Sequence, residues 1–294
     1  MSFNYLESSR YSGKPIHYYL IQGAENSPEM GRIGPFGLNN GEETQQLPWV
    51  LDPVTGEPLN FYAWPVFHSE PSQDGSLDKS DITITMAQGT VLDTLFLAYP
   101  PSQVVNLTIF QGHVGDELIQ DNYKALWMGR IVSCARKDSE LEFSCQPVST
   151  NLKRPGLRRN YQLGCPHVLY GSSCRANKAA ATTVREAAGI SGNVISLTQT
   201  VGTDAGQYAG GLLEWFHATT GVKEVRTIST ISPDGVNITI RGVVRGVVAG
   251  TQMSIIRGCN RLMSGCNSHG NILNFGGQPF IPLENPLSQK NQFY

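Results

Sequence analysis

The chain has 294 residues, of which 40% are hydrophobic and 16% charged, and its formal net charge is −2. This length suffices for two domains, each able to bury its own core. The near-neutral charge gives no reason to expect specific nucleic acid binding. The sequence also lacks the run of about 18 apolar residues that would predict a membrane span. The charged fraction lies below the soluble average of about 25%, which indicates a surface partly covered by other subunits.

The first residues carry neither the basic stretch nor the apolar segment of a secretory signal. We therefore expect synthesis in a reducing cytoplasm. Thiols stay reduced or bind metals there, and structural disulfides are rare.

Residues 24–80 are polar, rich in glycine and proline, and punctuated by aromatic residues such as Trp49 and Trp64. We interpret them as a long loop insertion that lies over the N-terminal domain or is ordered by a neighbour.

From residue 81 onward the dominant hydrophobic period is two, which is typical of half-buried strands. Two polar turns, at Lys137–Ser139 and Pro233–Gly235, each separate a pair of such segments and predict hairpins. The predicted strands are, in chain order, 81–86, 105–109, 126–132, 140–145, 227–231 and 236–240.

Helical signals are few. Residues 92–97 form a short apolar run that suits a helix or a strand. Residues 177–188 contain helix formers and precede a glycine that could end a helix. However, the β-branched residues of Thr182–Val184 favour a strand, so the segment stays ambiguous.

The segment Leu152–Tyr161 is basic, surrounds Pro155 and Gly156, and has no apolar period, which predicts a domain boundary. We therefore predict a mainly β protein. Residues 1–151 would form an N-terminal β domain, and residues 152–294 a loop-rich C-terminal domain.

Two of the six cysteines, Cys134 and Cys145, lie within the predicted hairpin strands. Cysteine in such a place is ordinarily a small buried hydrophobic residue. Nothing in the sequence supplies the base and electropositive pocket of a catalytic thiolate. We expect both to be reduced core thiols.

The other four cysteines lie in irregular, glycine-rich segments. Cys165 and Cys174 have eight residues between them, and Cys259 and Cys266 have six. Two close pairs from distant parts of the chain can meet around a metal centre, and nearby glycines allow close backbone approach. The spacing matches neither a zinc ribbon nor a bacterial ferredoxin, so it does not choose the metal. Two disulfides remain the main competitor if the mature protein works outside a cell.

Other polar residues stand close to these cysteines. His167 and His269 are possible further ligands, although such histidines more often only form hydrogen bonds within a loop. Arg175, Arg257 and Arg261 could offset the negative charge of four thiolates, or they could form a solvated face.

The cysteine-bearing segments carry a wider pattern. Before and around the first pair it comprises Tyr161-Gln162 and Leu169-Tyr170-Gly171, and after Cys266 it comprises Gly270-Asn271, Asn274-Phe275-Gly276-Gly277 and Pro279-Phe280-Ile281-Pro282. This pattern resembles the tail-tip hub proteins of long flexible-tailed bacteriophages, which include minor tail protein L-like proteins and gene-transfer-agent hub proteins. The opening, with Gly13-Lys14-Pro15-Ile16 before the aromatic strand at 17–20, also fits. The resemblance is sharp only in the C-terminal half, and residues 24–80 do not map onto it.

The resemblance implies a β-barrel-type hub domain at the N-terminus and a C-terminal domain organised by a four-cysteine cluster. The cluster would be a [4Fe–4S] centre that acts as a structural staple, with zinc as the alternative. Its ligands would be Cys165, Cys174, Cys259 and Cys266. The run 274–282 could fold closely over it.

The resemblance further implies a structural role at the virion tail tip, or baseplate hub, as a homotrimer made in the host cytoplasm. Partners would be the distal tail and tail-tube proteins, the tape-measure protein, and the central fibre or tip protein, to which this chain would join the tube. No membrane and no specific nucleic acid are implied as partners.

An enzymatic role is the competing hypothesis, either in redox chemistry or in cell-wall degradation. The sequence contains no dinucleotide fingerprint, Walker A motif, zinc-protease helix motif or nucleophile elbow. Glu70, Asp74 and Asp78 are scattered through a polar segment and form no catalytic carboxylate pair. We therefore expect no catalytic residues.

Overall fold

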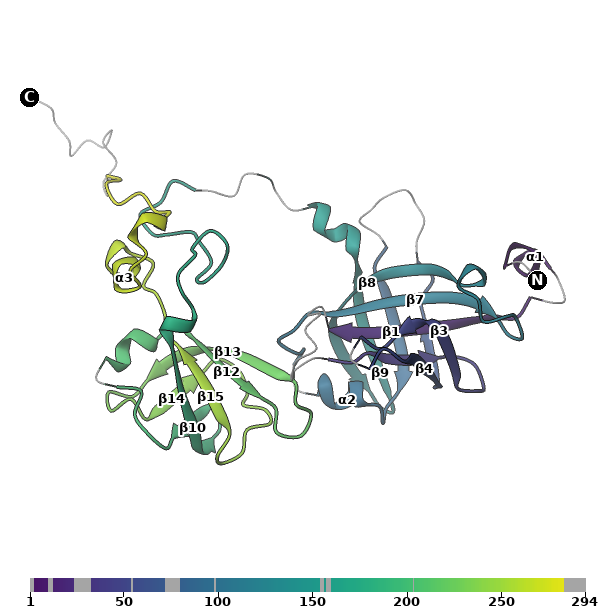
Figure 1. The fold of residues 1–294 in the computed structure, drawn as a ribbon, viewed down its shortest axis with the longest axis horizontal. Coiled ribbons are helices and arrows are strands. Elements are labelled where there is room, and N and C mark those ends of the chain that lie inside the picture. Colours follow the sequence, from purple (N-terminus) through teal and green to yellow (C-terminus); the bar gives the residue numbers. More distant parts are fainter. Residues whose placement is uncertain are drawn as a thin grey trace, which may run out of the picture. The chain divides into compact units, whose positions relative to one another are not determined.

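The structure is a computed structural model that describes residues 3–9, 13–23, 33–53, 55–71, 80–97, 99–153, 156, 160–202 and 204–282. The chain divides into two units (Figure 1). The N-terminal unit comprises Met1–Arg154 with Gly221–Lys223, and the C-terminal unit comprises Pro155–Thr220 with Glu224–Tyr294. Both are built mainly from strands, so the predicted fold class is confirmed. No helix in the described part of the chain is long and apolar enough to cross a membrane.

The N-terminal unit contains a nine-stranded sheet in the order β3-β4-β2-β1-β7-β8-β9-β6-β5. The predicted hairpin around Lys137–Ser139 is confirmed as β8 and β9, with Lys137 opposite Glu140. The run at 92–97 is resolved as a short helix, α2. The strands are β1 (Pro15–Gly23), β2 (Phe36–Asn39), β3 (Gln45–Leu51), β4 (Pro58–Ala63), β5 (Val66–His68), β6 (Ile82–Ala87), β7 (Val105–His113), β8 (Lys124–Lys137) and β9 (Glu140–Pro147). The helices are α1 (Phe3–Glu7) and α2 (Val91–Leu95), with 3-10 turns at Gln120–Asn122 and Val148–Lys153.

The prediction of a loop insertion at 24–80 is wrong for its central part, because β2, β3, β4 and β5 all lie there and join the sheet. These strands are three to seven residues long, too short for a clear alternation. Their pairing is also non-local, since β2 runs parallel to β4 with Leu38 opposite Tyr62. Residues 24–32 and 72–79 of the predicted insertion lie outside the described residues.

Strand β1 is buried on both faces of the sheet. Its sequence is therefore a nearly continuous apolar run and does not alternate between apolar and polar residues. Tyr18 and Tyr19 are adjacent and both are 0% exposed. Tyr18 packs with Phe61 in one apolar cluster, and Tyr19 packs with Ile109 in the other. The N-terminal unit therefore holds two apolar layers, one on each side of β1.

A pair of histidines lies beside this core. The rings of His17 and His68 are 4.6 Å apart between centroids, and the Tyr19 hydroxyl lies 2.7 Å from Nδ1 of His68. Burial, together with the positive charge that His68 can carry, lowers the pKa of His17 from 6.5 to about 4, although Glu7 opposes the shift. Burial also lowers the pKa of His68.

These shifts predict that the N-terminal unit loses stability as the pH falls from about 6.5 towards 4. In this window the unfolded chain binds protons that the folded chain does not, so the free energy of unfolding falls with pH. The His17→Gln variant should show a smaller fall. Urea midpoints at pH 7 and pH 5, followed by tryptophan fluorescence, measure this, because Trp49, Trp64 and Trp127 lie in this unit. An unchanged pH dependence in the variant would contradict the assignment to His17.

The C-terminal unit contains a closed six-stranded barrel in the order β10-β11-β14-β13-β12-β15. The resemblance implied a barrel-type domain at the N-terminus, whereas the described strands close into a barrel here and form a nine-stranded sheet there. The strands are β10 (Thr182–Ser191), β11 (Val194–Leu197), β12 (Leu212–Phe216), β13 (Lys223–Ile231), β14 (Asn237–Ile240) and β15 (Gln252–Ile256). Around them lie α3 (Met263–Ser268) and 3-10 turns at Ala179–Ala181, Ala205–Tyr208 and Ile272–Asn274.

Two sequence interpretations are settled by this barrel. The predicted hairpin around Pro233–Gly235 is confirmed as β13 and β14. The ambiguous segment 177–188 forms a single 3-10 turn and then β10, so the β-branched residues Thr182–Val184 outweigh the helix formers before them.

Candidate metal centre

The C-terminal unit brings the four predicted ligands to one place. Cys165, Cys174, Cys259 and Cys266 all line a single cavity of about 60 Å³. None of them forms a disulfide. The other residues that line the cavity are His167, Leu169, Gly210, Arg261, Leu262 and Asn274.

The two cysteine pairs arrive on segments that hydrogen bonds tie together. The backbone N–H of Cys165 donates to the carbonyl of Arg261 over 2.7 Å. The Tyr170 hydroxyl donates to the carbonyl of Arg257 over 2.5 Å. Since Arg257 directly follows β15, the barrel supplies a firm base for both segments. The cavity is therefore formed by irregular chain that is anchored to regular structure.

Nitrogen donors point at three of the four sulfurs. The backbone N–H of Gly276 lies 3.4 Å from Sγ of Cys165, and that of Arg261 lies 3.4 Å from Sγ of Cys259. The side-chain amide of Asn271 lies 3.7 Å from Sγ of Cys174. Such donors favour the thiolate over the thiol, and they stabilise the sulfur ligands of iron–sulfur clusters.

Asn271 has a role that sequence reasoning missed. It is 9% exposed, and its side-chain amide also donates to the carbonyl of Cys174 over 2.5 Å. The backbone carbonyl of Asn271 accepts a hydrogen bond from the Cys266 thiol, with 3.0 Å between sulfur and oxygen. Asn271 therefore links one cysteine of each pair. The sequence places Asn271 five residues after Cys266 and within the pattern that resembles the hub proteins, but neither observation reveals the contact with Cys174.

The thiols are close enough to influence one another electrostatically. Burial raises the pKa of Cys266, and the negative charges that Cys259, Cys165 and Cys174 can carry raise it further. Four thiolates at this site would therefore repel one another unless a cation compensated them. A bound metal centre would supply this positive charge, so the four cysteine thiols suit such a centre.

The arrangement of the sulfurs bears on the kind of metal. Within the described ranges, no three histidine, cysteine, aspartate or glutamate side chains are placed to share one metal ion. The four cysteines instead surround a cavity. A single zinc ion needs all four sulfurs at about 2.3 Å from one point, whereas an iron–sulfur cluster is held by thiolates spread around it. Four cysteine side chains around one cavity suit the donor set of an iron–sulfur cluster and equally that of a four-thiolate zinc site.

The two candidate histidines differ in position. His167 lines the cavity, and its Nδ1 lies 3.2 Å from the carbonyl oxygen of Asn274. His269 does not line the cavity, and its Nε2 lies 2.8 Å from the carbonyl oxygen of Gly258. His269 thus acts as a hydrogen-bonding loop residue.

The three arginines also differ. Arg261 lines the cavity. Arg175 donates from Nε to the carbonyl of Ser172, and Arg257 donates from Nη1 to the side-chain oxygen of Gln207. Of these three arginines, Arg261 alone lines the cavity.

Cys134 and Cys145 lie apart from the cavity, in β8 and β9 as predicted. Cys145 is 1% exposed, and burial raises its pKa to about 12. Cys134 packs against the same core, and burial raises its pKa too. Both behave as core thiols, as the sequence predicted.

Gly258 allows the close backbone approach that places Cys259. A Cβ at this position would lie 2.1 Å from the carbonyl oxygen of Ala209 and 2.7 Å from the backbone N of Gly211. The Gly258→Ala variant should therefore shift the Cys259 segment, cost about 1–3 kcal/mol of stability and reduce the metal content of the purified protein. Metal analysis with thermal unfolding measures both effects. Gly206→Ala is the matched control, because nothing lies within 4 Å of the added Cβ there. Equal metal content in the two variants would contradict this role of Gly258.

Comparisons with known proteins agree with parts of this picture. A family described as "Phage conserved hypothetical protein BR0599" matches residues 206–285, which include Cys259 and Cys266 but neither cysteine of the first pair. A protein of Xylella fastidiosa (strain 9a5c), described as uncharacterized, is 22% identical over 191 residues. That match covers 60% of this chain but only 35% of the Xylella protein, so the chain spans about a third of its relative's length.

A solved structure gives the broadest similarity. A chain of the "Virion of native gene transfer agent (GTA) particle" superposes with a TM-score of 0.72. The superposition covers 96% of this chain and 93% of that chain, at 17% sequence identity. The two chains therefore share their fold through both units.

Proposed function

We propose that this chain is a structural component of a phage or gene-transfer-agent virion, with its place at the tail-tip hub. There it would join the tail tube to the distal tip or fibres. The phage family match and the likeness to a virion chain over 96% of the sequence support the virion role. The tail-tip position rests on the resemblance of the cysteine-bearing segments to hub proteins.

The proposal includes a [4Fe–4S] cluster held by Cys165, Cys174, Cys259 and Cys266. The observation that carries it is that four cysteines from two distant segments line one cavity, with nitrogen donors directed at three of the sulfurs. When bound, the cluster would supply four strong bonds between segments that contain little regular structure. Metal binding of this kind adds free energy only to the folded state, so the cluster would act as a staple.

Assembly with other virion proteins is part of the same proposal. Several large apolar side chains on the cysteine-bearing segments are strongly exposed in the single chain, and these are Tyr161, Val168, Leu273 and Phe280. Exposed apolar groups of this size mark surfaces that partners cover. A homotrimer that also binds distal tail, tail-tube, tape-measure and central fibre or tip proteins would cover them.

Two alternatives differ in chemistry. Zinc in the same structural role would use the same four thiols. A redox or wall-degrading enzyme would need a substrate site with reactive groups. Glu70 is exposed, and Asp74 and Asp78 lie outside the described residues.

Labelling of particles tests the proposed place in the virion. Particles purified from producing cells would be treated with gold-labelled antibody against this chain and imaged by electron microscopy. Gold at the free end of the tail is expected. Gold on the head or along the tube, or particles that lack the chain by mass spectrometry, would refute the tail-tip role.

A further inference from the structure

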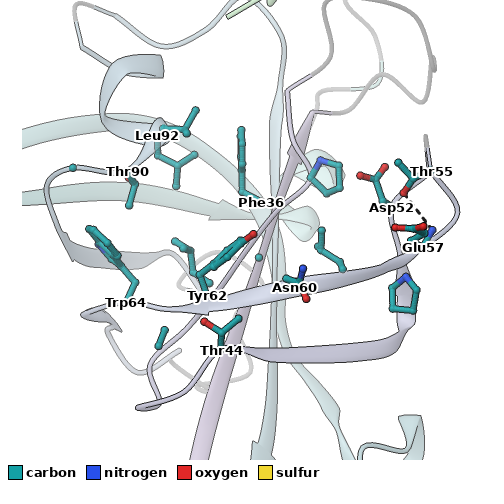
Figure 2. Close-up of a pocket in the computed structure, with 18 residues that line it drawn as sticks. Phe36, Thr44, Asp52, Thr55, Glu57, Asn60, Tyr62, Trp64, Thr90 and Leu92 are labelled. Carbon is teal, nitrogen blue, oxygen red and sulfur yellow. Dashed lines mark hydrogen bonds between the residues drawn. The ribbon is translucent and has the colours of Figure 1, made fainter.

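The N-terminal unit contains a cavity of about 650 Å³ that the proposed function does not use (Figure 2). This volume lies within the usual range of small-molecule sites, about 300–1,000 Å³. Strands β2 and β4 and the start of α2 contribute to its walls. The cavity belongs to a different unit from the cysteine centre, so its role is independent of any cluster.

One end of the cavity is aromatic. Phe36, Tyr62 and Trp64 lie on the same side of it in Figure 2, near Leu92. The indole N–H of Trp64 donates to the carbonyl of Ala87 over 3.1 Å, which fixes the ring. Tyr62 is 57% exposed, so its ring is available to a ligand.

The opposite end is acidic. Asp52 and Glu57 lie there with Thr55, away from the aromatic rings (Figure 2). A tight turn holds the two carboxylates, since the backbone N–H of Asp52 donates to the carbonyl of Glu57 and that of Gly56 donates back to Asp52. Gly56 has φ +72°, which favours glycine. No lysine, arginine or histidine is among the described residues that line the cavity.

Uncharged hydrogen-bonding groups lie between and beside these ends. Thr44 and Asn60 line the cavity, and so does Thr90. The Thr90 hydroxyl is shielded from solvent and has no hydrogen-bond partner among the residues described. A ligand that matches this cavity must therefore offer apolar surface and hydrogen-bonding groups along its whole length.

We infer that this cavity binds a neutral oligosaccharide. Sugar rings present apolar C–H faces that stack on aromatic rings such as Tyr62 and Trp64. Their hydroxyl groups donate to carboxylates such as Asp52 and Glu57, and charged acceptors form the stronger hydrogen bonds. Sugars that carry carboxylate or phosphate groups would be repelled, because the described lining of the cavity contains two acidic side chains and no basic one.

A lysine or arginine side chain fits less well. It carries polar atoms only at its tip, so it could satisfy the acidic end while leaving the shielded Thr90 hydroxyl at the aromatic end without a partner. Buried polar groups left unpaired lower affinity. The spread of uncharged polar groups along the cavity thus favours a sugar over a basic peptide.

Binding measurements with defined sugars test this site. Linear neutral tetra- to hexasaccharides of glucose and of N-acetylglucosamine would be titrated into the full chain by calorimetry, beside oligogalacturonate and oligolysine. At least one neutral sugar should bind, and oligogalacturonate should not. Tyr62→Ala should weaken that binding at least tenfold, and Glu57→Gln should weaken it several-fold.

The matched control is Phe67→Ala. Phe67 is an aromatic residue of the same unit, 64% exposed, that does not line the cavity, so its loss should leave binding unchanged. Binding of oligolysine that Glu57→Gln abolishes would overturn the assignment in favour of a basic peptide. A panel in which no neutral sugar binds would also overturn it, as would equal losses in Tyr62→Ala and Phe67→Ala.

Discussion

Replacing Cys266 with serine should reduce the iron content of anaerobically purified protein from about four atoms per chain to nearly none. Cys266 is 8% exposed and stands at the wall shared with the other three cysteines. A serine hydroxyl is not deprotonated near neutral pH, so it cannot replace the thiolate. Without the cluster, the cysteine-bearing segments would lose the staple that holds them together. Limited proteolysis should then cut within 160–175 or 257–282.

Cys134→Ser is the matched control for this experiment. Cys134 is also a free, partly buried cysteine, but it lies in β8, outside the cavity. This variant should keep its iron and its resistance to protease. If the Cys266→Ser protein kept the full iron content, or if both variants lost iron equally, the four-cysteine assignment would be wrong.

Removing Glu224 should cost the barrel about 3–5 kcal/mol of stability, because a buried charge network would lose its shared carboxylate. Glu224 is 0% exposed. Its carboxylate accepts hydrogen bonds from Nε of Arg245 at 2.9 Å and from Nη2 of Arg226 at 3.0 Å. In Glu224→Ala the two guanidinium groups would stay mostly buried, with side chains 12% and 13% exposed, and without this counter-charge.

Hydrogen exchange of β12–β15 peptides across a urea series measures the stability of the barrel directly. Glu186→Ala provides the comparison, since Glu186 is an exposed glutamate of the same barrel. Its loss should change the free energy of unfolding by no more than about 0.5 kcal/mol. Similar stabilities of Glu224→Ala and wild type would show that the network contributes little.

The parts of the fold that were predicted from sequence are those set by local chemistry. Polar turns at Lys137–Ser139 and Pro233–Gly235 separate strands that pair with each other, so alternation and turn residues were sufficient. Strands β2 and β4 escaped prediction because they are short and pair in parallel across an intervening strand and loop. Their partner is chosen by the sheet as a whole and leaves no local signal.

The candidate centre shows the same division. The four cysteines were identifiable because they occupy glycine-rich segments, whereas Cys134 and Cys145 sit in strands. The contact between Asn271 and Cys174 joins residues 97 apart in sequence, and no local pattern reveals it. The cavity beside Tyr62 and Trp64 was missed for a similar reason, because its walls come from strands that were interpreted as loop.

Metal analysis of the wild-type chain, purified without exposure to air, decides whether the four cysteines hold an iron–sulfur cluster. Iron, acid-labile sulfide and zinc would be measured on the same sample, together with its visible absorption spectrum. We expect a brown protein with about four iron atoms and about four sulfides per chain and little zinc. A colourless, folded protein whose six thiols all react freely, or one that holds about one zinc ion and no sulfide, would contradict the iron–sulfur centre.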